Sequence, residues 1–250
     1  MPELLDDSQA GSSGRRYSKL RRGLAWCVHL LTASGVICCL LALEATRQSR
    51  WQTALLWLVL AVIIDAVDGT FARLVDVKAV LPNFDGTLLD NLVDFANYVI
   101  VPALIIHRAH LVPDAASLCI ASLICLASSY QFCQNDAKTS DHFFRGFPSY
   151  WNVAALYLLA LDLSPRQNLA IVVALVVMVF VPIKYIYVTR TRAYRAITFA
   201  LTAIWAVMAM VILWQLPEPQ PLLVWSSMLY LLYYFCISLS LTLRKQPQPS

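Results

Sequence analysis

Apolar residues along the chain form long runs that are separated by short polar segments. A helix needs about 20 consecutive apolar residues to cross the hydrocarbon core of a bilayer. The pattern predicts eight such helices, at 24–43, 51–72, 88–106, 115–133, 149–162, 168–188, 194–214 and 221–242. The fifth run is short, so it either begins farther upstream, within the FFRGF segment, or forms a tilted or partial helix.

The composition supports the same class of protein. Of the 250 residues, 59% are hydrophobic and only 14% are charged, whereas soluble domains carry about 25% charged residues. The first run is long for a signal peptide and lacks a clear cleavage site, so we interpret it as an uncleaved span. We therefore expect an all-α integral membrane protein with a basic tail at 1–23, a transmembrane catalytic domain at 24–243 and a short tail at 244–250.

Lysine and arginine are distributed unevenly between the two sides of this topology. If the N-terminus is cytoplasmic, fifteen of the 19 Lys and Arg residues fall in cytoplasmic segments and four in outside segments. Cytoplasmic loops of membrane proteins carry such an excess of positive charge. The distribution predicts eight spans with both termini on the cytoplasmic side.

Four aspartates lie at the predicted cytoplasmic ends of the second and third apolar runs. Asp65 and Asp68 are three residues apart, and Asp90 and Asp94 are four apart, so each pair shares one face of a helix. Carboxylates at membrane depth are costly and indicate function. Four like charges that lie together need positive charge to stay ionised, and oxygen ligands favour magnesium, manganese or calcium over zinc. The sequence therefore predicts a site for two divalent cations.

The same stretch carries a recognisable signature. Residues 65–73 read D-x2-D-G-x2-A-R, and residues 86–94 read G-x3-D-x3-D. This pattern resembles the signature of the CDP-alcohol phosphotransferase family, with every signature position filled. The spacer of twelve residues between the two halves is longer than is usual in that family and resembles the spacer of its phosphatidylcholine synthase branch.

The resemblance implies catalytic roles for the charged residues of the signature. Asp65, Asp68 and Asp90 would ligate two Mg²⁺ or Mn²⁺ ions, and Asp94 would ligate the second ion, act as general base, or do both. Arg73 would contact the phosphates of the substrate. The catalytic candidates are therefore Asp94, Asp90 and Arg73.

The small residues of the signature would contact the nucleotide. Gly69, Ala72 and Gly86 would let the CMP moiety lie against the helix backbones, because small residues permit a close approach.

The segment at 134–152 is dense in aromatic and polar residues, and its FFRGFPSYWN part also resembles phosphatidylcholine synthases. A quaternary ammonium has no N–H to donate, so choline must be held by aromatic faces. Tyr150 and Trp151 are candidates, with Asn152 beside them; an ordinary aromatic belt at the membrane interface is the alternative. Arg145 would bind the lipid phosphate or simply face anionic headgroups.

The resemblance also implies an activity and an assembly. Such an enzyme would transfer the phosphatidyl group of CDP-diacylglycerol to choline, giving phosphatidylcholine and CMP, in the inner membrane with its active site facing the cytoplasm. Six core helices are usual in the family, so two C-terminal helices would be additions. A homodimer among membrane lipids is expected, and no nucleic-acid partner.

Two alternatives remain open. Serine, glycerol 3-phosphate or inositol phosphate could replace choline, although the last two would require a basic pocket where the segment at 134–152 is aromatic. From another class, a transporter or cation channel would use the acids as an ion site. Such sites lie near the bilayer midplane, and this hypothesis leaves Arg73 and the small signature residues unexplained.

Overall fold

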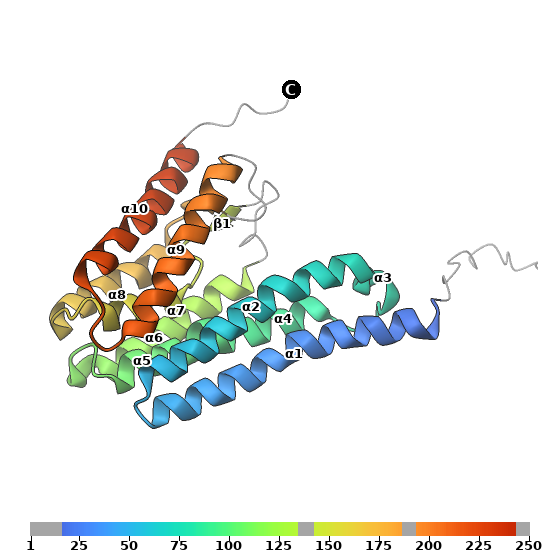
Figure 1. The fold of residues 1–250 in the computed structure, drawn as a ribbon, viewed down its shortest axis with the longest axis horizontal. Helices are drawn as coiled ribbons and strands as arrows, with labels where there is room; N and C mark the ends of the chain where they lie inside the picture. The colour runs from blue at the N-terminus through green and yellow to red at the C-terminus, as the bar shows by residue number, and fades with distance from the viewer. Residues whose placement is uncertain (1–16, 135–142, 187–193, 244–250) are drawn as a thin grey trace, which may run out of the picture.

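The computed structural model describes residues 17–134, 143–186 and 194–243 (Figure 1). Its elements, in chain order, are α1 (Lys19–Arg47), α2 (Trp51–Val75), α3 (Val77–Val80), α4 (Gly86–Phe95), the π-helical turn η1 (Ala96–Ile100), α5 (Val101–Arg108), α6 (Asp114–Cys133), β1 (Phe143–Arg145), α7 (Trp151–Ala160), α8 (Pro165–Phe180), β2 (Lys184–Ile186), α9 (Arg195–Gln215) and α10 (Pro221–Leu243). The predicted tail at 244–250 and most of the tail at 1–23 lie outside the described residues.

The helices account for the apolar runs of the sequence. Within the described ranges, six helical segments are long and apolar enough to cross a membrane: α1, α2, the continuous segment Gly86–Arg108, α6, α9 and α10. Two shorter apolar helices, α7 and α8, have 10 and 16 residues. At 1.5 Å per residue they are about 15 and 24 Å long, less than the hydrocarbon core of about 30 Å. The predicted all-α membrane fold with about eight apolar helices is confirmed, and α7 corresponds to the short fifth run.

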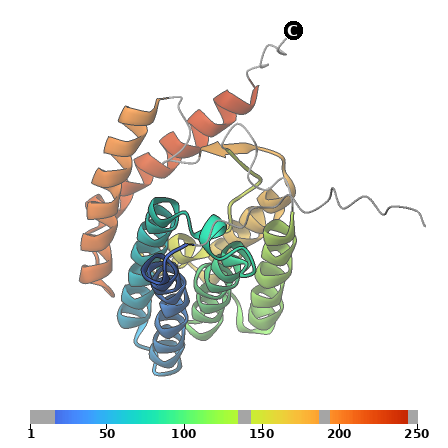
Figure 2. The same cartoon turned by 90° about the vertical axis from the view of Figure 1, so that its right-hand side faces the viewer.

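The two C-terminal helices lie outside the bundle that the earlier helices form (Figures 1 and 2). Gln52, near the start of α2, donates hydrogen bonds from its side-chain amide to the backbone oxygens of Leu213 (3.2 Å) and Trp214 (2.9 Å) at the end of α9. These bonds hold α9 beside α2. Helices α9 and α10 thus add a layer to the bundle, as the family resemblance implies.

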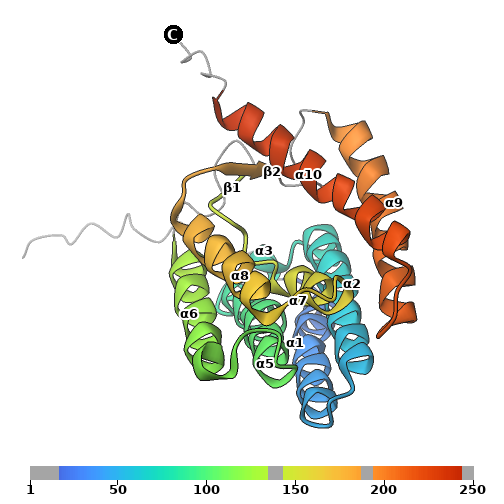
Figure 3. The same ribbon diagram turned by 90° about the vertical axis from the view of Figure 1, so that its left-hand side faces the viewer.

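A short antiparallel strand pair connects the bundle to α10. Strands β1 and β2 pair in the register Phe143 with Ile186, and Figure 3 shows them beside α10. The backbone N–H of Ile186 donates to Ser238 Oγ (3.2 Å), and that of Lys184 donates to Thr242 Oγ1 (2.8 Å), both on α10. These strands are an addition to the predicted helices, and β2 occupies the end of the run expected as the sixth span.

The third membrane span packs closely against α1. Its π-helical turn begins two residues after Asp94 and contains the buried Asn97, which donates to the backbone oxygens of Gly35 on α1 (3.0 Å) and Val93 (2.9 Å). A Cβ atom at Gly35 would lie 2.5 Å from Val93 Cγ1. The absence of a side chain at Gly35 therefore lets the two helices approach at this depth.

The ends of α2 and α4 are fixed by local bonds. Arg21 on α1 donates from Nε and Nη2 to the backbone oxygen of Val75, each at 3.3 Å, at the last residue of α2. Helix α4 begins after Asp85, whose carboxylate accepts the backbone N–H groups of Thr87 and Leu88, each at 3.0 Å. This side-chain cap satisfies two of the open N–H groups at the helix start. Arg21 thus fixes the end of α2 to α1, and Asp85 fixes the start of α4.

Candidate active site

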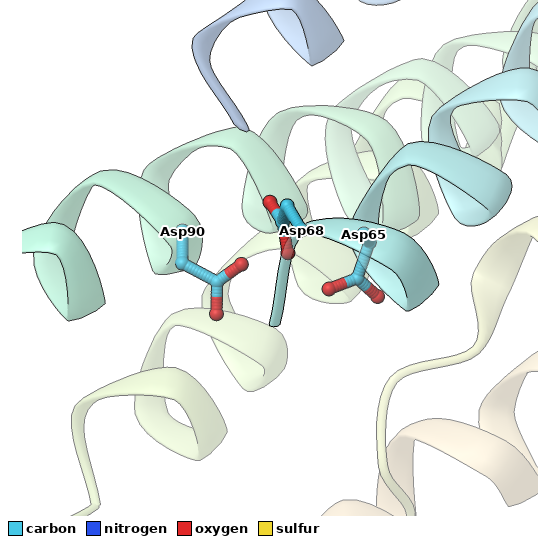
Figure 4. A group of neighbouring side chains, drawn as sticks. All are labelled: Asp65, Asp68 and Asp90. Atoms are coloured by element: carbon cyan, nitrogen blue, oxygen red, sulfur yellow. The ribbon is translucent and has the colours of Figure 1, made fainter. Parts of the chain in front are cut away.

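Three aspartates from two helices form one cluster of carboxylates. Asp65 and Asp68 lie near the end of α2, and Asp90 lies on α4. One carboxylate oxygen of each lies within 4.8 Å of the others, and Figure 4 shows the three side chains converging on one space. Asp68 is buried, with 5% of its surface exposed, and the other two are half-buried. We call these residues the aspartate cluster.

The aspartate cluster has the donor set of a hard divalent cation. It offers three carboxylate oxygens and no nitrogen or sulfur, which suits magnesium, manganese or calcium rather than zinc. Three carboxylates this close repel one another unless a positive charge joins them. The predicted metal residues Asp65, Asp68 and Asp90 are thus brought together, in a form that could hold an ion.

Neighbouring side chains contact the aspartate cluster from two sides. The hydroxyl of Tyr98, in η1, donates to Asp65 Oδ2 at 3.0 Å. The hydroxyl of Thr32, on α1, lies within hydrogen-bonding reach of Asp68. Neither residue is among the site residues predicted from the sequence. The periodicity indicates Tyr98, because it follows Asp94 by four residues and so shares its helix face, whereas Thr32 becomes a neighbour only through the packing of α1.

Asp94, the predicted general base, lies one helical turn beyond Asp90 on α4. It is half-buried and close enough to Tyr98 to act on its hydroxyl electrostatically. Among the described residues, the acidic side chains whose oxygens lie within 4.8 Å of one another are the three other aspartates. Asp94 therefore adjoins the aspartate cluster on the side of Tyr98.

The residues predicted to contact the nucleotide have different surroundings. Near Gly69, an added Cβ would meet only the flexible end of Arg73, with Nη1 at 3.5 Å. Arg73 is exposed, and its Nη2 donates to Thr70 Oγ1 at 3.1 Å, while Ala72 is half-buried. These residues leave an accessible surface on the last turns of α2.

Gly86 lies against a side chain of α1. A Cβ atom at this position would be 2.6 Å from Cε1 of the buried His29. The His29 ring also lies 4.3 Å from the ring of Phe84, between centroids. Packing of α1 against the start of α4 therefore requires a glycine here, whatever else the position contacts.

The predicted aromatic contacts for the alcohol separate into two kinds. Tyr150 is half-buried, and its ring centroid lies 6.5 Å from that of Tyr98. Trp151 is fully buried, and its Nε1–H donates to Ser128 Oγ at 2.8 Å in the core. The side chain of Asn152 accepts the backbone N–H of Val153 at 2.9 Å. Of these residues, Tyr150 lies in the chain of contacts that leads to the aspartate cluster.

Arg145 lies at the end of β1 and is exposed. It lines a cavity of about 300 Å³ together with residues of α6 and α8, among them Tyr130 and Phe180. None of the four aspartates lines this cavity. The structure thus places Arg145 at a cavity that the carboxylates do not line.

Several known proteins with similar sequences are named phosphatidylcholine synthase. The phosphatidylcholine synthase of Pseudomonas aeruginosa is 39% identical over 204 residues, which cover 82% of this chain and 86% of that protein. That of Legionella pneumophila is 38% identical over 221 residues, covering 86% of this chain and 87% of that protein. That of Bradyrhizobium diazoefficiens is 42% identical over 190 residues, covering 76% and 71%. No family model matches the chain. Identity at this level over most of both chains confirms the resemblance seen in the signature, and the chain belongs to the phosphatidylcholine synthase family.

Proposed function

We propose that the protein transfers the phosphatidyl group of CDP-diacylglycerol to choline and releases CMP. The observation that carries this proposal is the aspartate cluster at the ends of two membrane helices, in a chain whose relatives are named phosphatidylcholine synthase. A substrate with lipid tails and a charged nucleotide head fits this position, because the tails stay in the bilayer while the head reaches the polar end of the helices.

Two divalent ions, Mg²⁺ or Mn²⁺, are the cofactors in this proposal. Asp65, Asp68 and Asp90 hold them, with Asp94 as a further ligand of the second ion. Bound ions would neutralise the pyrophosphate and stabilise the negative charge that develops on the departing CMP. The hydrogen bond from Tyr98 to Asp65 orients that carboxylate toward the cluster.

Asp94 acts as the general base. Its carboxylate takes the proton from the alcohol's hydroxyl, and the oxygen forms a bond to the phosphorus that carries diacylglycerol. The bond from that phosphorus to the bridging oxygen breaks, and CMP leaves with the electron pair. The position of Asp94 beside the aspartate cluster supports this role. A base must lie near the reacting phosphate and keep a carboxylate oxygen that can accept the proton.

The exposed face of α2 holds the nucleotide. Gly69 and Ala72 allow the CMP moiety to approach the backbone, and Arg73 offers a guanidinium to the phosphates. Gly86 serves the site by allowing α1 and α4 to pack closely, in addition to any contact with CMP. The open surroundings of Gly69 support this assignment.

The surroundings of the reaction are also part of the proposal. The enzyme resides in the inner membrane as a homodimer, with its active site and both termini facing the cytoplasm. The excess of Lys and Arg in the segments on that side supports the orientation. Among the aromatic candidates, Tyr150 contacts choline and Trp151 packs in the core. Arg145 binds a lipid phosphate at its cavity, and Asn152 supports the start of α7.

A comparison of alcohols tests the proposed function. Purified protein in detergent is given CDP-diacylglycerol and Mg²⁺, and CMP release is measured with choline, serine, glycerol 3-phosphate or inositol phosphate. Release that requires choline is the expected result. Release with another of the alcohols, and none with choline, would contradict the choline assignment while leaving the metal site in place. No release with any of them, in protein shown to be folded, would support an ion transporter instead.

A further inference from the structure

Four tyrosines from four separate elements meet beside the aspartate cluster. They are Tyr98 in η1, Tyr150 before α7, Tyr185 in β2 and Tyr234 in α10, and we call them the tyrosine cluster. The ring centroids of Tyr98 and Tyr150 lie 6.5 Å apart, and those of Tyr185 and Tyr234 are stacked at 6.0 Å. Tyr150 and Tyr234 are close enough to interact electrostatically. The two ring pairs lie near each other, because α7, which begins after Tyr150, is joined to α10 by a hydrogen bond between the hydroxyls of Tyr157 and Ser227 at 2.7 Å.

One end of the tyrosine cluster is the reaction centre. Tyr98 donates its hydroxyl to Asp65 and lies within electrostatic reach of Asp94. Asp94 is the residue proposed to take the proton of the alcohol. The rest of an alcohol whose hydroxyl lies at Asp94 would therefore extend toward these rings.

The rings are not packed like the rest of the core. Tyr98, Tyr150 and Tyr234 are half-buried, whereas neighbouring Trp151 is fully buried. Part of each of these three side chains is therefore not covered by protein. The fourth, Tyr185, is 3% exposed.

The hydroxyl of Tyr185 is enclosed by the surrounding protein. It is buried and has no hydrogen-bond partner among the described residues, which is uncommon because an unpaired buried polar group costs free energy. Burial raises the pKa of Tyr185 to about 12, so the phenol stays neutral. Tyr185 is thus a neutral, enclosed ring that supports the ring of Tyr234 from one side.

A quaternary ammonium matches these features. It has no N–H group, so ring faces and nearby negative charge hold it better than hydrogen-bond acceptors do. The tyrosine cluster supplies the rings. We propose that the tyrosine cluster binds the quaternary ammonium of the alcohol, with Tyr234 as a specificity-determining residue and Tyr185 supporting its ring. This inference rests on the proposed function, whose substrate it assigns to particular side chains.

The inference gives β2 and α10 a role in substrate selection. Tyr234 donates its hydroxyl to the backbone oxygen of Ile186 at 2.9 Å, and Ile186 donates its N–H to Ser238 Oγ. These bonds fix β2 on α10, so Tyr185 and Tyr234 hold their stacked arrangement. The layer added by the C-terminal helices thereby completes a site that the signature residues begin.

Substitution of Tyr234 tests the inference by separating choline from the lipid substrate. In Tyr234→Leu we expect the KM for choline to rise by about tenfold, the size of a well-placed cation–π contact, with the KM for CDP-diacylglycerol unchanged. Tyr233→Leu is the matched control, because Tyr233 is the next residue on α10 and its hydroxyl meets Thr198 of α9 at 2.9 Å. A choline KM in Tyr234→Leu equal to that of the control would overturn the inference.

Tyr234→Phe separates the ring from its hydroxyl. This variant keeps the aromatic face and loses the bond to Ile186, so we expect its choline KM to stay within about threefold of the wild type, since Phe also attracts cations. A rise as large as that in Tyr234→Leu would assign the effect to the position of β2 and overturn binding by the ring.

A neutral analogue tests the wild-type protein without any substitution, and so applies even if a variant does not fold. 3,3-Dimethylbutan-1-ol has the shape of choline without its charge. We expect its kcat/KM to be at least about tenfold below that of choline; equal use of both would overturn the inference. A wild-type enzyme that ignores choline but uses another alcohol would instead refute the proposed function, so the two failures are distinguishable.

Discussion

Gly69 and Gly86 belong to one signature, but their surroundings differ. An added Cβ at Gly69 meets only the end of the Arg73 side chain at 3.5 Å, whereas one at Gly86 would lie 2.6 Å from the ring of His29. The first contact is ordinary and flexible, while the second requires a buried ring to move. The same change to alanine should therefore weaken ligand binding at Gly69 and lower stability at Gly86.

Gly69→Ala should leave the protein stable and weaken its binding of CMP. Alanine is the better helix former by about 0.5–1 kcal/mol, so the melting temperature should not fall. We expect the dissociation constant of CMP, measured by titration in Mg²⁺, to rise at least about tenfold, which equals about 1.4 kcal/mol. Wild-type affinity in Gly69→Ala would remove this position from the nucleotide site.

Gly86→Ala should destabilise the protein because the new methyl group displaces His29. Overpacking of this kind costs about 1–3 kcal/mol, measured as a lower melting temperature. His29→Ala makes room for the methyl group, so the cost of Gly86→Ala should shrink in that background, as a double-mutant cycle would reveal. Equal costs in both backgrounds would show that the close contact does not matter.

Asp94 and the aspartate cluster should respond differently to removal of charge. In Asp94→Asn we expect turnover to fall by about 10²–10⁴-fold, the usual contribution of a general base, while CMP still raises the melting temperature in the presence of Mg²⁺. In Asp68→Asn both turnover and this stabilisation should be lost. A fully active Asp94→Asn enzyme would exclude Asp94 as the base.

At the scale of elements, the start of α4 positions the second half of the site. Asp90 and Asp94 lie on this helix, whose first N–H groups are bound by the carboxylate of Asp85. Asp85 lies outside the signature, and the structure gives it the role of an N-cap. The start of the helix that carries Asp90 and Asp94 is therefore stabilised by a residue outside the signature.

Asp85→Ala should lower the free energy of unfolding by about 1 kcal/mol, because the cap is lost. Asp85→Asn keeps an oxygen that can accept the same N–H groups, so its melting temperature should stay close to that of the wild type. If both variants have the melting temperature of the wild type, the cap does not stabilise α4.

Most elements could be predicted from the sequence because membrane helices show in local composition. The exceptions depend on contacts between distant segments. Strand β2 ends an apolar run, and its pairing with β1 joins residues about forty positions apart, which local composition does not reveal. Similarly, Trp151 looks like an interfacial aromatic until its bond to Ser128 on α6 is known. The aspartates were predictable because their spacing alone puts each pair on one helix face.

At the scale of the whole molecule, the surface is that of a protein in lipid. Large apolar side chains are exposed on the outer helices, for example Leu40 (61%), Val207 (65%) and Leu222 (80%). Water would penalise such a surface, but a bilayer covers it at no cost. The protein is therefore a multi-pass membrane protein, and the proposed orientation decides which ends of its helices meet the cytoplasm.

Labelling of introduced cysteines tests this orientation. Gln48→Cys lies in the turn between α1 and α2, and Asn83→Cys lies before α4; both positions are exposed. In cells with a permeable outer envelope but an intact inner membrane, an impermeant maleimide should label Gln48→Cys above the background of the native cysteines. Asn83→Cys should be labelled only after the inner membrane has been permeabilised. The reverse pattern would place the aspartate cluster outside.

The measurement that tests the account most directly is the dependence of choline-driven CMP release on divalent ions. Wild-type protein is stripped with EDTA and then titrated with Mg²⁺ or Mn²⁺, beside Asp68→Asn and Asp90→Asn. We predict that stripping abolishes release, that either ion restores it in the wild type, and that both variants remain at least about a hundredfold slower, because a bound ion contributes several kcal/mol to such reactions. Undiminished release in EDTA, or wild-type rates in both variants, would contradict a metal site at the aspartate cluster.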